Sequence, residues 1–434
     1  MESEKPSANL AQTLNVGQAV VLATEIVIGS GLLILPGLVY FQAGTAAVYA
    51  WIIDAIMVIP LLVVFGTLGS SYPNAGGVAG FVRTAFGSIS ADIAAILLMG
   101  AFFLGIPGIA LTGANYFGYL WHEGALAHVL ESTGLLVTAG VLNYLRTPLS
   151  KTVQQILSYT LVLILIGVSL VSVLFVPHPS HSIAPPGAWV KTIPVLGMVF
   201  FAFTGWEMLS FMGEEFRNPK RDFPLAIIVS FLLVVFVYVG VALAIQRTLP
   251  LNDIRAIQAP IAAIMAKVLG RWSGKAVAII GVLIILTNLN GAIWAASRLL
   301  FSSAREGLLP KFFAGISPKV GIPRRSVFMT TFMCILVVVI HGLSILSLHE
   351  MFSLAGKTFF LLYLFSALAY LRLFRNTFAK IFGLGTFLCC LLFAGSFGVG
   401  LLYPLSLVLL GLSLGIIHIR SEAQGRPKKN WNAT

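Results

Sequence analysis

Long, uninterrupted apolar runs are the feature that most restricts the fold of this 434-residue chain. Hydrophobic residues make up 58% of the sequence and charged residues 10%, and the mean hydropathy is +0.96. Soluble proteins contain about 45–50% apolar and about 25% charged residues, so a soluble chain of this composition could not cover its surface with polar groups. This excludes a cytosolic enzyme, a nucleic-acid-binding domain and a disordered scaffold. The sequence predicts an all-α polytopic membrane protein in a lipid bilayer.

The apolar runs are long enough to cross a bilayer as helices. A transmembrane β-barrel would instead show alternating segments of about ten residues. A window of about 20 residues predicts twelve transmembrane helices. They lie near 16–40, 46–68, 91–120, 126–145, 154–176, 194–215, 225–247, 275–298, 326–346, 350–371, 381–398 and 402–419.

The basic residues predict the orientation of these spans. Lys and Arg number 27 against 15 Asp and Glu, a net charge of +12. Most of the 27 fall on one side if the N-terminus lies in the cytoplasm, and the exceptions gather in the long loop 247–275. Because basic residues collect in cytoplasmic loops, we expect both termini to be cytoplasmic. We expect the protein in a plasma membrane, a bacterial inner membrane being favoured.

An internal similarity suggests two inverted repeats. The decapeptides 78–87 and 261–270 share an apolar pattern and a closing glycine, and each precedes an apolar run. Five predicted spans separate them, and an odd number turns the second copy upside down, as in many secondary transporters. The predicted organisation is a cytoplasmic tail (1–15), a first repeat (16–176), an external loop (177–193), a second repeat (194–371), two further spans (372–419) and a cytoplasmic tail (420–434).

The first span of each predicted repeat contains a glycine break. Gly29 and Gly31 flank Ser30 in the middle of the first span, and Thr204 precedes Gly205 in the sixth. Glycine is a poor helix former, and unwound backbone inside a membrane persists only where it lines a cavity. The freed N–H and C=O groups suit the carboxylate and ammonium of a zwitterion. The alternative is a patch of small residues for helix packing.

Several motifs in order resemble the amino acid–polyamine–organocation (APC) superfamily of transporters, from about residue 16 to 375. Two of them, GGVAGFVRTAFG and NPKRDFP, are most similar to a branch with bacterial methionine and branched-chain amino acid exporters. The motifs are Gly29-Ser30-Gly31 with Leu35-Pro36-Gly37, Tyr72-Pro73-Asn74-Ala75-Gly76-Gly77 with Ala85-Phe86-Gly87, Gly205-Trp206-Glu207, Glu215 to Pro224, and Ser297-Arg298 with Arg305 to Pro310.

The resemblance implies a LeuT-type fold of 5+5 inverted repeats plus two C-terminal helices, and it implies site residues. The substrate carboxylate would meet Ser30 and Gly31. The amine would meet carbonyl groups of Val27 and of the break in the sixth span. An aromatic ring of that span, from Phe201, Phe203 or Trp206, would close over the substrate. The implied substrate-binding residues are Val27, Ser30, Gly31, Phe201, Phe203, Thr204 and Gly205.

Four ionisable residues inside predicted spans are candidates for coupling, because such residues are costly and usually functional. Glu207 belongs to the family's Gly-x-Glu motif and is the first candidate for a proton site, the alternative being a structural hydrogen bond. Glu25 departs from the family pattern and is the second, the alternative being a water-facing vestibule residue. Asp54 and Lys357 receive no assignment. The lysine that some members carry in the fifth span is missing from 157–165, and 288–297 lacks a hydroxyl pair for sodium.

These observations predict a secondary amino acid transporter with alternating access, for neutral or apolar substrates, acting as an exporter or exchanger. A cationic amino acid or polyamine antiporter is the alternative, and a channel is a weaker one. We expect no enzyme activity, cofactor or metal, since the sequence lacks the corresponding motifs, and Cys334, Cys389 and Cys390 lie within apolar runs. The expected partners are an amino acid, protons if transport is coupled to them, and lipid. Export versus uptake and the oligomeric state stay open.

Overall fold

A computed structural model describes residues 16–72, 77–121, 124–145, 151–176, 184–206, 218–251, 253, 257–317 and 321–425. Within these ranges the regular elements are α-helices and short 3-10 helices, without a β-strand. Ten helical segments of the described chain are long and apolar enough to cross a membrane. The prediction of an all-α polytopic membrane protein is therefore confirmed.

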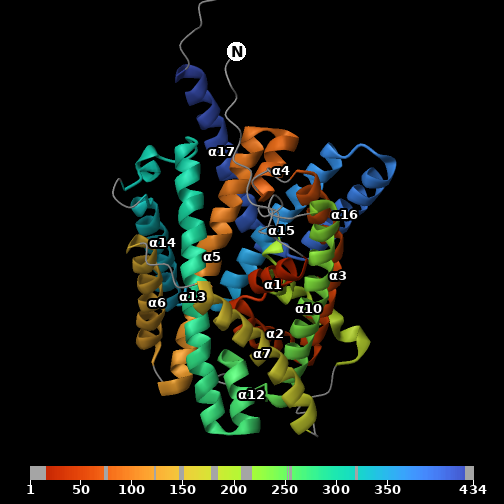
Figure 1. The fold of residues 1–434 in the computed structure, drawn as a ribbon, viewed down its shortest axis with the longest axis vertical. Helices are drawn as coiled ribbons and strands as arrows, with labels where there is room; N and C mark the ends of the chain where they lie inside the picture. Colours follow the sequence, from red (N-terminus) through yellow and green to blue (C-terminus); the bar gives the residue numbers. More distant parts are fainter. Residues whose placement is uncertain are drawn as a thin grey trace, which may run out of the picture.

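The described helices and their order along the chain can be followed in Figure 1. In chain order they are α1 (Val16–Val27), η1 (Ser30–Leu33), α2 (Leu35–Ala43), η2 (Gly44–Ala46), α3 (Ala47–Ser71), α4 (Gly77–Phe86), α5 (Ser88–Trp121), α6 (Ala125–Leu145), α7 (Lys151–Phe175), η3 (Pro186–Val195), α8 (Leu196–Ala202), α10 (Pro219–Thr248), α12 (Pro260–Leu269), α13 (Arg271–Arg305), η5 (Lys311–Ala314), α14 (Arg324–Gly342), α15 (Leu348–Leu373), α16 (Thr377–Gly395), η6 (Gly398–Leu401) and α17 (Leu402–Gly425).

The ten long segments correspond to ten of the twelve predicted spans. The two remaining spans are the first and the sixth, which carry the glycine breaks. The first is divided into α1, η1 and α2, and α2 continues through η2 into α3. In the sixth, α8 ends at Ala202 and the described chain stops at residue 206. The interruption of these two spans is thus a property of the folded chain.

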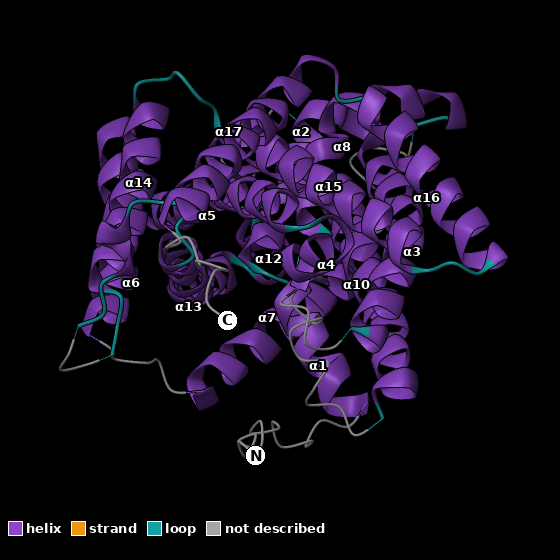
Figure 2. Cartoon of the chain, turned by 90° about the horizontal axis from the view of Figure 1, so that it is seen from above, coloured by secondary structure: helices purple, strands orange, loops and turns teal. Residues whose placement is uncertain are grey.

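The long helix α5 is the most buried span of the described chain. α5 and α13 pack along each other, α17 lies against α5, and α15 lies against both α5 and α8. The pair α6 and α14 lies at one edge of the bundle, whereas α3 and α16 lie at the opposite edge (Figures 1 and 2). Of the interrupted helices, α1 packs against α10, and α2 packs against α3, α8 and α10.

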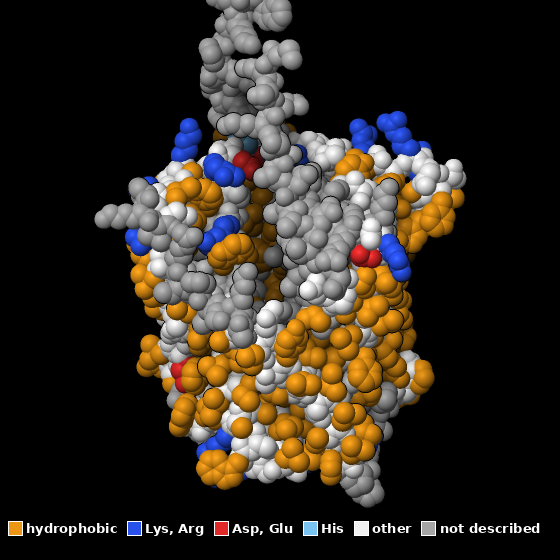
Figure 3. Space-filling model, viewed as in Figure 1, with side chains coloured by type: hydrophobic (Ala, Val, Ile, Leu, Met, Phe, Trp, Pro, Cys, Tyr) orange, Lys and Arg blue, Asp and Glu red, His pale blue; other side chains and the backbone are white. Residues whose placement is uncertain are grey.

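Apolar side chains cover the outside of the bundle as well as its interior. Buried residues from most helices form one continuous core. Large apolar side chains on α7, α10 and α16 are also exposed, among them Leu163 at 68%, Leu232 at 63% and Leu392 at 81%. On the face seen in Figure 3, hydrophobic side chains form a broad belt, and Lys and Arg side chains lie mainly above it. Such a surface suits hydrocarbon better than water.

A glycine crossing fixes α8 against α15. A β-carbon built on Gly356 would lie 1.7 Å from the carbonyl oxygen of Gly197 and 3.0 Å from the backbone nitrogen of Phe201. No real side chain fits at that distance, so the two backbones touch. Small residues permit this close approach between membrane helices. The crossing places the last turn of α8, where the sixth span breaks, directly on α15.

Candidate functional site

The break in the first span lies between Val27 and Ser30. α1 ends at Val27, Gly29 is extended with φ −87° and ψ −180°, and η1 begins at Ser30. The Gly29 N–H donates back to the Val27 carbonyl at 2.8 Å, and the Leu32 N–H donates to the Gly29 carbonyl. The first N–H groups of a helix have no acceptor within it, and in η1 these belong to Ser30 and Gly31. This backbone is where the predicted carboxylate contact falls.

The break in the sixth span follows Ala202. The Phe203 N–H donates to the Phe200 carbonyl at 2.9 Å, and the Thr204 hydroxyl donates to the Phe201 carbonyl at 2.7 Å. Gly205 has φ +116°, in the region that glycine tolerates and L-residues with a side chain avoid. The glycine is therefore needed where the helix ends. Glu207 lies outside the described residues, as does the chain up to residue 217.

A tyrosine of α10 joins the two breaks. The hydroxyl oxygen of Tyr238 lies 2.9 Å from the carbonyl oxygen of Val27 and 2.7 Å from that of Ala202. A hydroxyl group has one proton, so it donates to one of these carbonyls at a time. The ends of α1 and α8 therefore present two carbonyl oxygens to one donor. The two helix ends that meet here carry the carbonyl groups that we expect, from the sequence, to bind the amine of a substrate.

Phe201 faces the first break from the sixth span. A β-carbon built on Gly31 would lie 3.8 Å from Phe201 Cε1, and one on Gly105 of α5 would lie 2.9 Å from Cε2. The ring centroid of Phe201 is 5.1 Å from that of Phe352 and 6.1 Å from that of Phe359, both on α15. The half-buried Phe201 ring thus lies between the first break, α5 and α15.

The other two aromatic candidates pack on side chains of α3 and α10. Phe203 is fully buried, with its ring centroid 6.3 Å from that of Trp51 and 5.0 Å from that of Tyr238. Trp206 is fully buried too, with its ring 6.1 Å from that of Phe231 on α10. Of the three, only Phe201 has a described contact with the backbone of the first span. Phe201 is therefore the aromatic candidate whose ring faces Gly31.

Sequence reasoning missed two polar residues beside the first break. The buried Tyr116 of α5 donates its hydroxyl to the Leu33 carbonyl at 2.9 Å. A β-carbon on Gly29 would lie 3.7 Å from Nδ2 of Asn288 on α13. Polar side chains in apolar spans are the signal that could have identified both. The sequence did not show which of the many polar residues would face the break.

The predicted ionisable residues are only partly described. The side chains of Glu25 and Ser30 lie outside the described part of the structure, so their roles stay predictions. Asp54 is completely buried on α3, and neither of its carboxyl oxygens has a hydrogen-bond partner among the described residues. Lys357 extends along Gly197 of α8 towards η6, where its Nζ lies 5.7 Å from the ring centroid of Phe397.

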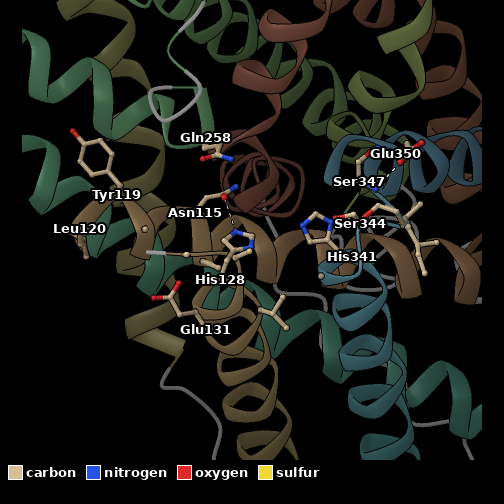
Figure 4. A pocket seen from close by; sticks show the side chains of 18 of the residues that line it. Asn115, Tyr119, Leu120, His128, Glu131, Gln258, His341, Ser344, Ser347 and Glu350 are labelled. Carbon is tan, nitrogen blue, oxygen red and sulfur yellow. Dashed lines mark hydrogen bonds between the residues drawn. The ribbon is translucent and has the colours of Figure 1, made fainter. Parts of the chain in front are cut away.

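One cavity lies away from the two breaks. It has a volume of about 890 Å³ and is lined by the ends of α5, α6, α14 and α15 together with charged residues of α13. In it, His128 lies with Nε2 2.9 Å from Asn115 Oδ1, and His341 lies across from His128 (Figure 4). None of the predicted substrate-binding residues lines this cavity. A second space of about 350 Å³ between α1, α7 and α10 includes Thr24, one turn before the first break.

Neither space resembles a metal centre. Among the described residues, no group of three or more His, Cys, Asp or Glu side chains is arranged to hold a metal ion. The described cysteines are free thiols, of which Cys334 and Cys390 are buried. Among the described residues at the breaks, the available groups are backbone N–H and C=O groups, hydroxyl groups, the Asn288 amide and aromatic rings.

Comparison with known proteins gives the family. The sequence pattern of the family described as Amino acid permease matches residues 14–414. The uncharacterized amino acid permease YecA of Bacillus subtilis is 28% identical over 396 residues, covering 91% of this chain and 93% of its own. The L-methionine/branched-chain amino acid exporter YjeH of Escherichia coli is 29% identical over 396 residues, covering 89% and 92%. The branched-chain amino acid permease BcaP of Bacillus subtilis is 24% identical over 330 residues, covering 72% and 71%.

The match covers nearly all of the described helices, both interrupted spans included. It agrees with an apolar helical bundle in which two broken helices meet at their ends. The chain is a multi-pass membrane protein that belongs to the amino acid permease family, a family of amino acid transporters.

Proposed function

We propose that this protein is a secondary active transporter of neutral, apolar amino acids that works by alternating access as an exporter or exchanger. The observation that carries the proposal is the meeting of the two interrupted helices at Tyr238 and Phe201. The names of two relatives support the substrate class, since YjeH exports L-methionine and branched-chain amino acids and BcaP is a branched-chain amino acid permease.

The substrate's charged groups would bind to the broken backbone. The carboxylate would accept hydrogen bonds from N–H groups of Ser30 and Gly31. The ammonium would donate to carbonyl groups at the ends of α1 and α8, from Val27 and from the stretch Phe201 to Gly205. A protonated amine suits this place because two carbonyls there share the single Tyr238 proton.

The surroundings of Phe201 favour an apolar substrate side chain. Its described neighbours are Gly31, Gly105 and the rings of Phe352 and Phe359. These groups offer dispersion contacts and no charge, so they suit a methionine or branched-chain side chain. A lysine or polyamine substrate would need acidic side chains beside Phe201. The two substrate classes, apolar and cationic, can therefore be distinguished by which of them the protein transports.

The wider organisation proposed from the sequence completes this description. Residues 16–176 and 194–371 would form the two inverted repeats, and 372–419 the two additional spans. Both termini would lie in the cytoplasm, with the protein in a bacterial inner membrane. In this orientation the cavity of about 890 Å³ faces the external side, because the connections after α5 and α14 line it.

Substrate exchange by purified protein in lipid vesicles tests the function. Labelled methionine, leucine and isoleucine should exchange, whereas decarboxylated and N-acylated analogues should not compete. Each analogue leaves one set of buried backbone groups unpaired, at a cost of about 1–3 kcal/mol. If simple amines compete as well as amino acids, the cationic alternative is correct.

The Gly31→Val variant tests the position of the site. A β-carbon there would already lie 3.2 Å from Leu35 Cδ1, and the added methyl groups of valine would extend towards Phe201 and block the backbone. We expect exchange to be lost while the folded fraction is retained. Gly134→Ala is the control, since nothing lies within 4 Å of its β-carbon. If Gly31→Val exchanged substrate with unchanged apparent affinity, the substrate would not bind at Gly31.

A further inference from the structure

Asp54 is a carboxyl group buried in the membrane part of the bundle, without a partner among the described residues. It lies in α3, about 10 Å along the helix from its first residue at a rise of about 1.5 Å per residue. Its exposed fraction is 0%, and within the part of the chain that the structure describes neither Oδ1 nor Oδ2 has a hydrogen-bond partner. The buried Asp92 of α5 contrasts with it, because Asp92 Oδ2 lies 3.2 Å from His418 Nδ1 of α17.

Such a carboxyl group is neutral in this conformation. An isolated ionised carboxylate in a nonpolar interior carries a desolvation cost that only a paired charge or several hydrogen bonds can offset. Asp54 has neither among the described residues. The group therefore takes up a proton, and this conformation is a proton-loaded one.

The described helices packed on α3 supply no countercharge to it. These elements are α2, η2, η3, α8, α10, α15 and α16. Their described ionisable groups within the bundle lie elsewhere or are buried thiols: Tyr40 donates to the Leu249 carbonyl, Tyr238 lies at the two breaks, Tyr363 and Tyr370 pack on aromatic rings, Lys357 lies at Phe397, Cys389 lies at Met57, and Cys390 is a buried thiol. Their other ionisable side chains, Lys191, Arg221, Asp222, Arg247, His349, Glu350, Arg372 and Lys380, lie at the element ends or the protein surface.

Asp54 is linked to the two breaks through Trp51. Residues three apart lie on one face of a helix, so the Trp51 indole is the neighbour one turn away. Its ring centroid lies 5.3 Å from that of Tyr238 and 6.3 Å from that of Phe203. The indole N–H of Trp51 is also buried without an acceptor. The Asp54 carboxyl group and the Trp51 indole N–H, both unsatisfied among the described residues, therefore lie one turn apart on α3. The Trp51 ring in turn packs on Tyr238 and Phe203, at the ends of α1 and α8.

We propose that Asp54 binds the proton that is coupled to amino acid movement. When α1 and α8 shift at Tyr238 and Phe203, the packing around Trp51 changes and water reaches the carboxyl group. Asp54 then releases its proton to that water and becomes a carboxylate, and it is reprotonated from the other side before the dry conformation reforms. This assignment rests on the proposed transport function and names its coupling ion.

Transport by Asp54→Asn in vesicles with an imposed pH gradient tests the assignment. At one proton per substrate, a gradient of about one pH unit supports a concentration ratio of about tenfold. We expect wild type and the control Asp92→Asn to reach this ratio, and Asp54→Asn to equilibrate substrate without accumulation. Exchange of labelled for unlabelled substrate, which needs no net proton movement, should continue in Asp54→Asn. That exchange distinguishes lost coupling from lost transport.

Infrared spectroscopy of the same proteins gives a readout independent of transport. Wild type should show the C=O stretch of a neutral carboxylic acid, and Asp54→Asn should lack that contribution while Asp92→Asn keeps it. Accumulation by Asp54→Asn with the wild-type pH response overturns the assignment and points to Glu207 or Glu25, to be tested by the same change to Gln. A gradient response driven by sodium instead of pH overturns it too. Absence of any exchange in wild type would contradict the proposed function itself.

Discussion

The hydroxyl oxygen of Tyr238 lies 2.9 Å from the carbonyl oxygen of Val27, the last residue of α1. The same hydroxyl lies 2.7 Å from the carbonyl oxygen of Ala202, the last residue of α8. Helix ends leave carbonyl groups without intrahelical donors, and here one tyrosine serves two such ends. Tyr238 therefore ties the two interrupted spans together.

Replacing Tyr238 with Phe should weaken both folding and transport. The change leaves two buried carbonyls without this donor, so we expect the free energy of unfolding to fall by about 1–3 kcal/mol. Substrate exchange should slow because the ends of α1 and α8 are no longer held together. Thermal unfolding and exchange in vesicles measure the two effects.

Tyr403→Phe is the matched control for this change. The Tyr403 hydroxyl donates to the Gly100 carbonyl at 3.0 Å, between α17 and α5 and away from the breaks. It should lose about 0.5–1.5 kcal/mol of stability and keep wild-type exchange. Equal exchange in both variants would show that Tyr238 has a structural role alone.

Gly205→Ala should disturb the end of the sixth half-helix. Its φ of +116° is strained for a residue with a side chain, at a cost of about 1–3 kcal/mol. We expect a lower unfolding temperature and reduced exchange. Gly134→Ala on α6, whose surroundings are open, should differ little from wild type in both measurements. A Gly205→Ala protein as stable as Gly134→Ala would mean that this conformation is not required.

Gly356→Ala should separate α8 from α15. The added methyl group would lie 1.7 Å from the Gly197 carbonyl oxygen, so the backbones must move apart. Overpacking of this kind costs about 1–3 kcal/mol, and it displaces Phe201 from the first break. Binding affinity, measured by ligand-induced thermal stabilisation, should fall more than with Gly167→Ala, which meets nothing within 4 Å. Unchanged affinity would show that the crossing does not position the site.

Alanine substitutions at Phe201 and Phe203 should have different effects. Phe201 faces Gly31, so Phe201→Ala should change the preference between large and small apolar amino acids by about 1–3 kcal/mol. Phe203 packs on Trp51 and Tyr238, so Phe203→Ala should lower stability by about 3–5 kcal/mol and leave that preference unchanged. Competition assays and unfolding curves separate them. If only Phe203→Ala changed the preference between large and small amino acids, Phe203 and not Phe201 would contact the substrate.

The sequence by itself determined the membrane-spanning class, the family and the two places where helices break. Apolar runs of span length permit helices in a bilayer, because hydrocarbon offers no partner for a free backbone group. Gly31 and Gly205 weaken a helix whatever the surrounding tertiary structure. Their effect is therefore local and can be predicted without a structure. For the same reason, the first and sixth spans could be distinguished from the remaining ten.

Only the tertiary structure decided which side chains meet at those breaks. Phe201 and Phe203 are two residues apart in one apolar segment, and the sequence treats them alike. Their rings diverge because helix geometry turns each residue about 100° from the last, and because the Gly197–Gly356 crossing fixes which face α15 covers. Asp54 likewise could not be interpreted from its position in a span. The cost of its charge depends on the absence of partners from seven other elements, which packing alone determines.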